Sequence, residues 1–265
     1  MEHKKISSQN GTVHYWINRC GAENAKCIVF THGLTANHLM FEKQVEYFST
    51  EYTVITWDVP LHGESRPYNN FSYENTAKEL KAILDAESIQ KVVLVGMSMG
   101  GYPSQEFAIL YPDYVSGFVA LDTTPLGLHY YTRSDRFWLK TVGPLAKLFT
   151  DKMLRTSMAE SVSRTKYAHD LMIKMLEPLS KADIVEQMDI AYGRFFDRKE
   201  TVHHDFPVLI LLGEYDKTGK VKQYCEAWSK KEGYPLHIIK DAAHLSNADN
   251  YEAVNKEISE FIQAL

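Results

Sequence analysis

The fold of this chain is decided by the stretch Val92-Val93-Leu94-Val95-Gly96-Met97-Ser98-Met99-Gly100-Gly101. Its first part is an apolar, largely β-branched run with the length of a buried strand, and its second part has the pattern Gly-x-Ser-x-Gly-Gly. The segment 102–110 that follows has helical character, and its Pro103 is compatible with a first helical turn. The stretch therefore predicts a strand, a sharp turn that carries a serine, and a helix.

A serine in such a turn is suited to nucleophilic catalysis. Its hydroxyl must be exposed to a base and placed beside donors that can receive a developing oxyanion. The turn forces the serine into a sparsely populated backbone region and crowds the positions two before and two after it, where Gly96 and Gly100 stand. It also points the unpaired N–H groups of the next helix at the reaction centre. Ser98 is thus a candidate nucleophile, and the backbone N–H of Met99 is a candidate oxyanion donor.

Composition and charge are those of an ordinary globular protein. The 265 residues can form one large α/β domain, and the net charge of −5 with no run rich in Lys and Arg disfavours nucleic acid as a partner. No apolar run reaches membrane-spanning length, and polar residues follow the start of the chain where a signal peptide would be apolar. The three cysteines, Cys20, Cys27 and Cys225, have no metal-ligand spacing. We expect a cytoplasmic monomer or homodimer with reduced thiols and no membrane partner.

Strands alternate with helices along most of the chain. Asn10-Gly11 predicts a hairpin between strands 4–8 and 12–18. Further strands are expected at 27–30, 53–57, 92–95, 117–121, 206–212 and 236–240, and helices at 40–48, 73–87, 102–110, 221–231 and 253–265. This alternation predicts an α/β fold with a mostly parallel central sheet flanked by helices.

The alternation is interrupted between residues 126 and 204. No run there looks like a strand, and apolar residues recur with helical spacing, as in Leu171, Met175 and Leu179. We expect a core domain of residues 1–125 and 205–265, with a helical cap inserted over 126–204. The cap aromatic residues are predicted mostly to form the core of the cap, with a minority lining an apolar acyl pocket. They are Tyr130, Tyr131, Phe137, Trp138, Phe149, Phe195 and Phe196.

A catalytic serine needs a histidine as base and an acid to orient the histidine. The strand predicted at 206–212 runs into Asp216, and the strand predicted at 236–240 runs into His244. Sites of open α/β sheets form at the carboxyl ends of the strands, so both side chains are expected near Ser98. The chain order Ser98, Asp216, His244 is one in which such triads occur.

On these motifs the chain resembles the α/β-hydrolase fold superfamily, in its compact, capped esterase and lactonase branch. The resemblance rests on His32-Gly33, Asp58 with His62-Gly63-Glu64-Ser65, the turn at Ser98, Gly213-Glu214-Tyr215-Asp216, and Ala243-His244. It implies that Ser98 is the nucleophile, His244 the base and Asp216 its acid, with the N–H of Leu34 as the second oxyanion donor beside that of Met99.

The chain departs from the family pattern at two positions. Leu61 stands where family members commonly have glycine, and Lys217 and Thr218 follow Asp216 where Pro-Val is common. Neither departure affects a residue of the proposed triad. Both bear on the loops at the rim of the site.

Other polar residues at strand ends have competing interpretations. Asp122 also ends a strand and is an alternative acid, whereas Asp58 is interpreted as a residue that stabilises its own loop and Glu64 as a solvated residue of that loop. His32 and His62 are expected to be structural. The trio of His203, His204 and Asp205 can be interpreted as a metal site, but neighbouring histidines on an extended segment point in different directions, so we expect surface residues.

The sequence thus predicts a serine hydrolase that acts on carboxylic esters or lactones through an acyl-enzyme intermediate. Its expected partner is a small-molecule acyl substrate, and the chemistry requires neither a metal nor an organic cofactor. Because one fold hosts many reactions, a carbon–carbon bond hydrolase, a thioesterase or an aminopeptidase stays open as an alternative. From another class, a ligand receptor with a vestigial hydrolase site also stays open.

Overall fold

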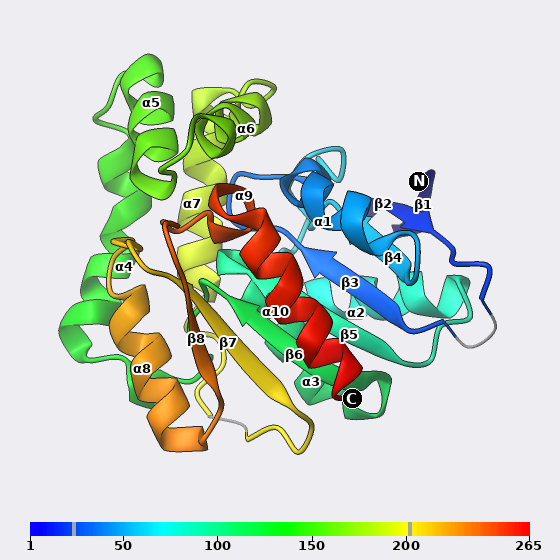
Figure 1. Ribbon diagram of the computed structural model, residues 1–265. Helices are drawn as coiled ribbons and strands as arrows, with labels where there is room; N and C mark the ends of the chain where they lie inside the picture. Colours follow the sequence, from blue (N-terminus) through cyan, green and yellow to red (C-terminus); the bar gives the residue numbers. More distant parts are fainter. Residues whose placement is uncertain (23–24, 201–202) are drawn as a thin grey trace.

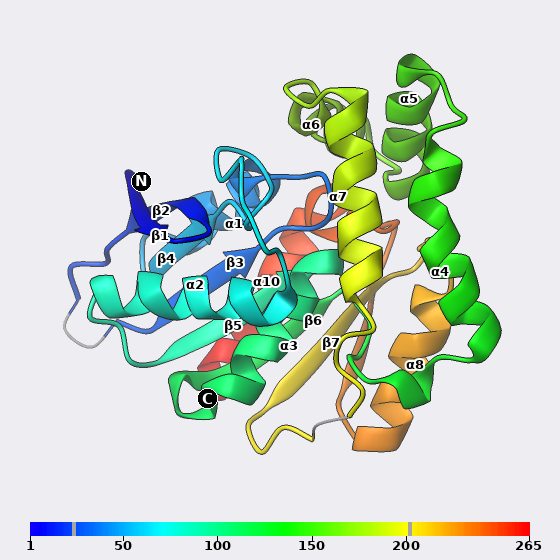
Figure 2. The same cartoon turned by 180° about the vertical axis from the view of Figure 1, so that it is seen from behind.

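The computed structural model describes residues 1–22, 25–200 and 203–265. Its centre is a twisted sheet with the strand order β1-β2-β4-β3-β5-β6-β7-β8 and helices on both faces (Figures 1 and 2). The strands are β1 (Glu2–Ser8), β2 (Gly11–Asn18), β3 (Cys27–Thr31), β4 (Thr53–Trp57), β5 (Val92–Met97), β6 (Val115–Leu121), β7 (Val208–Gly213) and β8 (Leu236–Ile239). Strand β2 pairs antiparallel with β1 and β4, and the pairs from β4 to β8 are parallel. The predicted α/β fold is confirmed.

The central strands are buried on both faces, which explains their continuous apolar runs. In β5, Val92 and Leu94 belong to one hydrophobic cluster, and Val93 and Val95 belong to the other. The first cluster includes side chains of α2 (Tyr73–Ala86), α3 (Gly101–Leu110) and α8 (Val221–Glu232). The second includes side chains of α1 (Glu42–Phe48) and α10 (Tyr251–Gln263). The sheet is therefore the middle layer of three.

The predicted hairpin and helices of the core are confirmed with small shifts at their ends. The helix expected at 40–48 begins as a 3₁₀ turn, η1 (His38–Phe41), before α1. A short helix, α9 (Ser246–Asp249), precedes α10. Within the described residues, no helix combines the length and the apolar composition needed to cross a membrane.

Among the described residues, four α-helices lie between β6 and β7: α4 (Arg133–Ala146), α5 (Asp151–Val162), α6 (Lys166–Leu176) and α7 (Lys181–Arg194). Both views show them beyond the carboxyl ends of the central strands, at the upper left in Figure 1. The described part of 126–204 contains no strand. The domain boundaries 1–125 with 205–265 and 126–204 stay predictions, and they include residues 23–24 and 201–202, which lie outside the described residues.

Of the seven cap aromatic residues, most of which were predicted to be in the core of the cap, four are buried or half-buried and three are exposed. Phe137 and Trp138 are each 63% exposed and Phe149 is 41% exposed. The reason lies in the contact between α4 and α7, where Gly143 lets the helices approach so closely that an added Cβ would lie 1.9 Å from Asp189 Oδ1. Because Gly143 makes this contact, Phe137 and Trp138 of the same helix lie on its outer face, and Phe149 follows the end of α4.

Candidate active site

The serine turn has the conformation that its sequence predicts. Strand β5 ends at Met97, and Ser98 begins a short 3₁₀ turn, η2 (Ser98–Gly100), with φ +50° in the left-handed region. A Cβ at position 96 would lie 2.7 Å from Gly100 O, and one at position 100 would lie 2.1 Å from Thr31 O. Only glycine fits at either place, so both glycines are needed for the serine to stand at the carboxyl edge of the sheet.

The structure brings Ser98, His244 and Asp216 together in one hydrogen-bonded line. His244 Nε2 lies 2.8 Å from Ser98 Oγ, and His244 Nδ1 lies 2.8 Å from Asp216 Oδ2. An ionised carboxylate only accepts hydrogen bonds, so Nδ1–H donates to Asp216 and Nε2 presents its lone pair to the hydroxyl of Ser98. Asp216 Oδ1 accepts the N–H of Thr218 at 2.7 Å, which fixes the orientation of the carboxylate.

The charges around His244 make it a better base than an isolated buried histidine. Burial lowers the pKa of His244, but the charge of Asp216, the hydrogen bond to it and the charge of Asp122 together raise that pKa above its ordinary value. Burial raises the pKa of Asp216, while the charge of His244 and the hydrogen bonds of His244 and Thr218 bring it below the ordinary range. His244, with Asp216 beside it, is thus suited to accept a proton from a neighbouring hydroxyl.

The alternative acid, Asp122, has other partners. It directly follows β6 with φ +45° and is fully buried, and its Oδ1 accepts the N–H of Gly213 at 2.7 Å. Its Oδ2 accepts the hydroxyl of Ser246. Burial, followed by the charge of Asp216, raises the pKa of Asp122 to about 7. In this arrangement Asp216, and not Asp122, receives the Nδ1–H of His244.

The expected oxyanion donors come from two different segments near Ser98. Met99 follows the serine in η2, and Leu34 lines the same cavity as Ser98 from the loop after β3. His32 fixes this loop: its Nε2 accepts the N–H of Val59 at 3.0 Å, so its Nδ1–H donates to Gly33 O at 2.7 Å. Burial lowers the pKa of His32 to about 4, which keeps the ring neutral and structural, as expected. The donor role of the two N–H groups stays a prediction.

The loop after β4 is stabilised by Asp58, as predicted. This buried carboxylate accepts the N–H of His38 at 2.7 Å, its Nδ1–H at 2.9 Å, and the N–H of Glu64 at 2.6 Å. Leu61 takes φ +72°, the left-handed conformation that glycine favours. His62 is buried and its Nδ1 lies 3.1 Å from Pro60 O, so it belongs to the loop structure as expected.

The prediction of surface residues at 203–205 is wrong for His204. This side chain is only 6% exposed and stacks on Phe206 with ring centroids 4.9 Å apart. Its backbone N–H donates to the hydroxyl of Tyr234, which draws the segment inward. His203 lies at the surface, 2.8 Å from Glu232 Oε2.

A cavity of about 170 Å³ opens beside Ser98 and His244. Methionine side chains line it from the core and from the helices between β6 and β7, together with Val162, Tyr192 and Leu245. The methionines are Met40, Met97, Met158, Met172 and Met188. The cap aromatic residues from which a minority was predicted to line an acyl pocket are not among its lining residues. Sequence reasoning missed the methionines, because the helical spacing of Met158, Met172 and Met188 is equally typical of packed core and Met97 belongs to a buried strand.

Comparisons with known proteins agree with this architecture. A family model described as "alpha/beta hydrolase fold" matches residues 26–251. The chain is 39% identical over 260 residues to 3-oxoadipate enol-lactonase 1 of Acinetobacter baylyi, a match that covers 97% of this chain and 95% of that protein. It is 26% identical over 250 residues to a 2-(acetamidomethylene)succinate hydrolase of Mesorhizobium japonicum, covering 89% and 88% of the two chains.

Solved structures show the same fold. A thermophilic esterase from Thermogutta terrifontis superposes with a TM-score of 0.80 at 21% identity, covering 100% of this chain and 99% of the other. Est816, described as an N-acyl homoserine lactone degrading enzyme, superposes with a TM-score of 0.77 at 18% identity, covering 97% and 100%. At these identities the likeness concerns the fold alone.

Proposed function

Because the chain belongs to the alpha/beta hydrolase fold family, we propose that it is a serine hydrolase of carboxylic esters or lactones, with Ser98, His244 and Asp216 as its triad. The observation that carries the proposal is the 2.8 Å distance between His244 Nε2 and Ser98 Oγ. It supports the proposal because a histidine nitrogen at this distance can take the proton of the oxygen that would attack a carbonyl carbon.

The proposed reaction has two halves. Ser98 Oγ attacks the carbonyl carbon while its proton passes to His244 Nε2, and the N–H groups of Leu34 and Met99 stabilise the oxyanion. The bond to the leaving group breaks as His244 protonates that group, which leaves an acyl-enzyme. A water molecule then attacks the acyl carbon, His244 takes its proton, and the collapse of the second tetrahedral intermediate returns the proton to Ser98.

The cavity supports a small, neutral acyl group as substrate. An apolar cavity of roughly 150 Å³ in another protein holds a benzene molecule, and the cavity here, about 170 Å³, is of similar size. Among the described residues that line it, none is a lysine or an arginine. Methionine is flexible and fills irregular space, so the cavity can adapt to acyl chains of different shape.

A second candidate substrate is an enol-lactone that carries a carboxylate. The relative at 39% identity is named for the enol-lactone of 3-oxoadipate, and this lactone is such an anion. The match covers nearly the whole of both chains. The two candidates differ in charge. Comparing kcat/KM for a neutral ester, a neutral lactone and the 3-oxoadipate enol-lactone therefore separates them.

The experiment that tests the proposed function replaces Ser98 with alanine and measures hydrolysis across a panel of esters and lactones. We expect turnover to disappear in Ser98→Ala and to persist in Ser161→Ala, because Ser161 lines the same cavity without a bond to His244. Circular dichroism of both variants checks their folding. Undiminished turnover in Ser98→Ala would sink the proposal.

The same panel, extended to further substrates, distinguishes ester or lactone hydrolysis from the remaining activities of this fold. Thioesters, aminoacyl anilides and a vinylogous diketone report on thioesterase, aminopeptidase and carbon–carbon bond hydrolase activity. A receptor with a vestigial site would release one burst of product from an activated ester and then stall. Steady turnover of an ester or lactone, faster than that of every other class, is the result that the proposal requires.

A further inference from the structure

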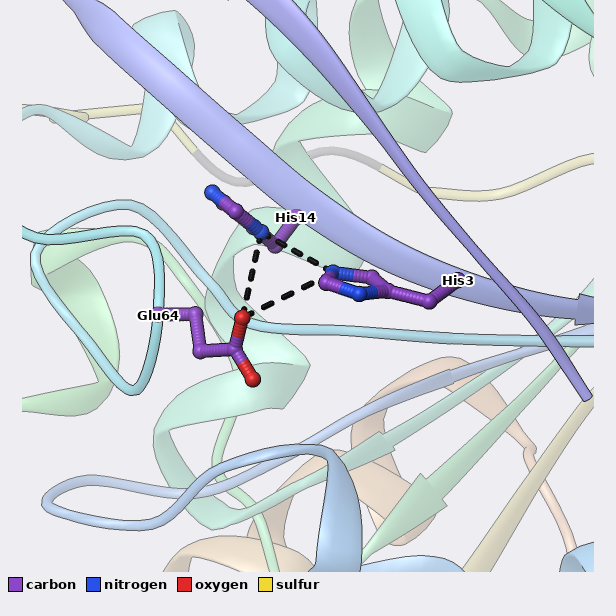
Figure 3. A group of neighbouring side chains, drawn as sticks. All are labelled: His3, His14 and Glu64. Carbon is purple, nitrogen blue, oxygen red and sulfur yellow. Dashed lines mark hydrogen bonds and ion pairs between the residues drawn. The ribbon is translucent and has the colours of Figure 1, made fainter.

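Three metal-binding side chains meet on the surface of the N-terminal hairpin (Figure 3). His3 comes from β1, His14 from β2, and Glu64 from the loop after β4. His3 Nε2 lies 2.9 Å from His14 Nδ1, and Glu64 Oε2 lies 3.3 Å from His14 Nδ1 and 3.6 Å from His3 Nε2. We propose that these three residues form a binding site for a zinc-like divalent transition metal ion, separate from the active site.

The spacing of the three ligand atoms fits tetrahedral coordination. Zinc binds imidazole nitrogen and carboxylate oxygen at roughly 2.0–2.1 Å, and the corners of a tetrahedron of that size lie roughly 3.3 Å apart. The three separations of 2.9, 3.3 and 3.6 Å are distributed around this value. An ion at this place would replace the hydrogen bond that joins the two imidazoles and would keep all three ligand atoms close to their present separations.

The ligand set selects the class of metal. Two imidazoles and one carboxylate suit zinc and the neighbouring transition metals, whereas calcium and magnesium prefer oxygen ligands throughout. The side chains of His3 and Glu64 are 44% and 53% exposed, so the fourth coordination position faces solvent and can hold water. His14, with a side chain 18% exposed, forms the inner wall.

The hairpin register brings the two histidines to one face. His3 pairs with Trp16 and Lys5 pairs with His14, so His3 and His14 are diagonal neighbours on the same side of the sheet. The ring of His3 stacks on Trp16 with centroids 4.5 Å apart and planes within 5°. This stacking holds the imidazole of an exposed edge strand in place before any ion binds.

Backbone hydrogen bonds fix the other two ligands relative to each other. The N–H of His14 donates to Ser65 Oγ at 2.9 Å, and its carbonyl accepts the N–H of Asp58 at 2.9 Å. The N–H of Glu64 donates to Asp58 Oδ2 at 2.6 Å. Strand β2 and the loop that carries Glu64 are therefore joined at two points, and the cluster is held by the fold.

An ion at this site would join the edge strand β1 to the loop after β4. Arg66, two residues after Glu64, lies 3.2 Å from Asp183 of α7, so the same loop also contacts the helices over the active site. We expect bound metal to stabilise the folded chain. The ester or lactone chemistry at Ser98 does not require it.

The test is zinc binding by the full chain, purified without a polyhistidine tag. Isothermal titration and native mass spectrometry should give one ion per chain, and substitution with Co²⁺ should give the visible absorption of four-coordinate cobalt. The melting temperature should rise by roughly 5 °C when free zinc is about 100 times Kd. No saturable binding, or the six-coordinate cobalt spectrum of a solvated ion, would refute the site.

Variants assign the binding to these residues. His14→Gln and Glu64→Gln should each weaken zinc binding by more than ~10-fold, because each removes a ligand. His237→Gln is the matched control, since it removes another exposed histidine beside a carboxylate, Glu257 at 2.6 Å, and should leave binding unchanged. An equal loss in His237→Gln, or none in His14→Gln, would contradict the proposal. Ser98→Ala should bind zinc normally, so the result is independent of the proposed function.

Discussion

Replacement of Asp216 by asparagine tests the triad most sharply. In Asp216→Asn the amide oxygen must occupy the position of Oδ1, because the N–H of Thr218 donates to that atom at 2.7 Å. The amide NH₂ then faces His244 Nδ1, which has to accept a hydrogen bond instead of donating one. The ring proton moves to Nε2, and Nε2 can no longer take the proton of Ser98.

We expect kcat to fall by roughly 10⁴-fold, the loss measured when the same tautomer is imposed in a serine protease. This loss corresponds to about 5 kcal/mol of activation free energy. The assay is the initial rate of hydrolysis of an activated ester at saturating substrate, with thermal melting to check that the variant is folded.

Asp122→Asn is the matched control. Both aspartates are buried beyond the end of a strand, and asparagine tolerates the φ of +45° at position 122. We expect its kcat to stay near that of the unmodified protein. Because the charge of Asp122 raises the pKa of His244, the acid limb of kcat/KM should move to lower pH in this variant. A larger loss in Asp122→Asn than in Asp216→Asn would refute the assignment and make Asp122 the acid.

Individual contacts give three further predictions. The pKa of Asp122 is about 7 in the folded protein against 3.8 for an unperturbed aspartate, so its contribution to the free energy of unfolding is fully present below pH 3.8 and is lost as pH rises through about 7. Urea unfolding should show this pH dependence in the unmodified protein relative to Asp122→Asn, and identical profiles would contradict it. Met188→Trp fills the cavity and should lower kcat/KM for a hexanoate ester far more than for an acetate ester; an unchanged ratio would exclude Met188 from the acyl site. Gly63→Ala places a Cβ 2.1 Å from Asp58 Oδ2 at φ +48° and should cost about 1–3 kcal/mol of stability, whereas Gly219→Ala, at φ +51° in open space, should cost less. Denaturant titration of both glycine variants measures this difference in stability. Equal losses of stability would show that contact with Asp58 does not add to the cost at position 63.

The strands and the residues at their ends could be predicted because their signals are local. The apolar run of β4 was predicted at 53–57, the bounds that the structure has. Ser98 follows its strand directly, and Asp216 and His244 follow theirs within a few residues. Asp122 and Asp216 both follow strands, so the sequence alone does not decide which of them is the acid that orients His244. The choice depends on which carboxylate reaches His244, and that distance is set by tertiary packing.

The cavity and the metal-binding cluster could not be predicted for a related reason. Met172 and Met188 have the spacing of core residues, and only the arrangement of the helices shows that they line the cavity beside Ser98. The hairpin at Asn10-Gly11 was predicted, but Glu64 reaches the hairpin through a loop whose path is fixed by Asp58. Contacts between distant segments leave no periodic pattern in the sequence.

The position of α4 to α7 in the chain has a consequence for the evolution of this protein. All the side chains that they contribute to the cavity, from Met158 to Tyr192, come from one continuous stretch between β6 and β7. Ser98, Asp216 and His244 lie outside that stretch. Recombination at two points could therefore exchange the side chains that these helices contribute to the cavity, while the proposed triad is inherited unchanged. A new specificity can evolve in this architecture without the loss of an existing chemistry.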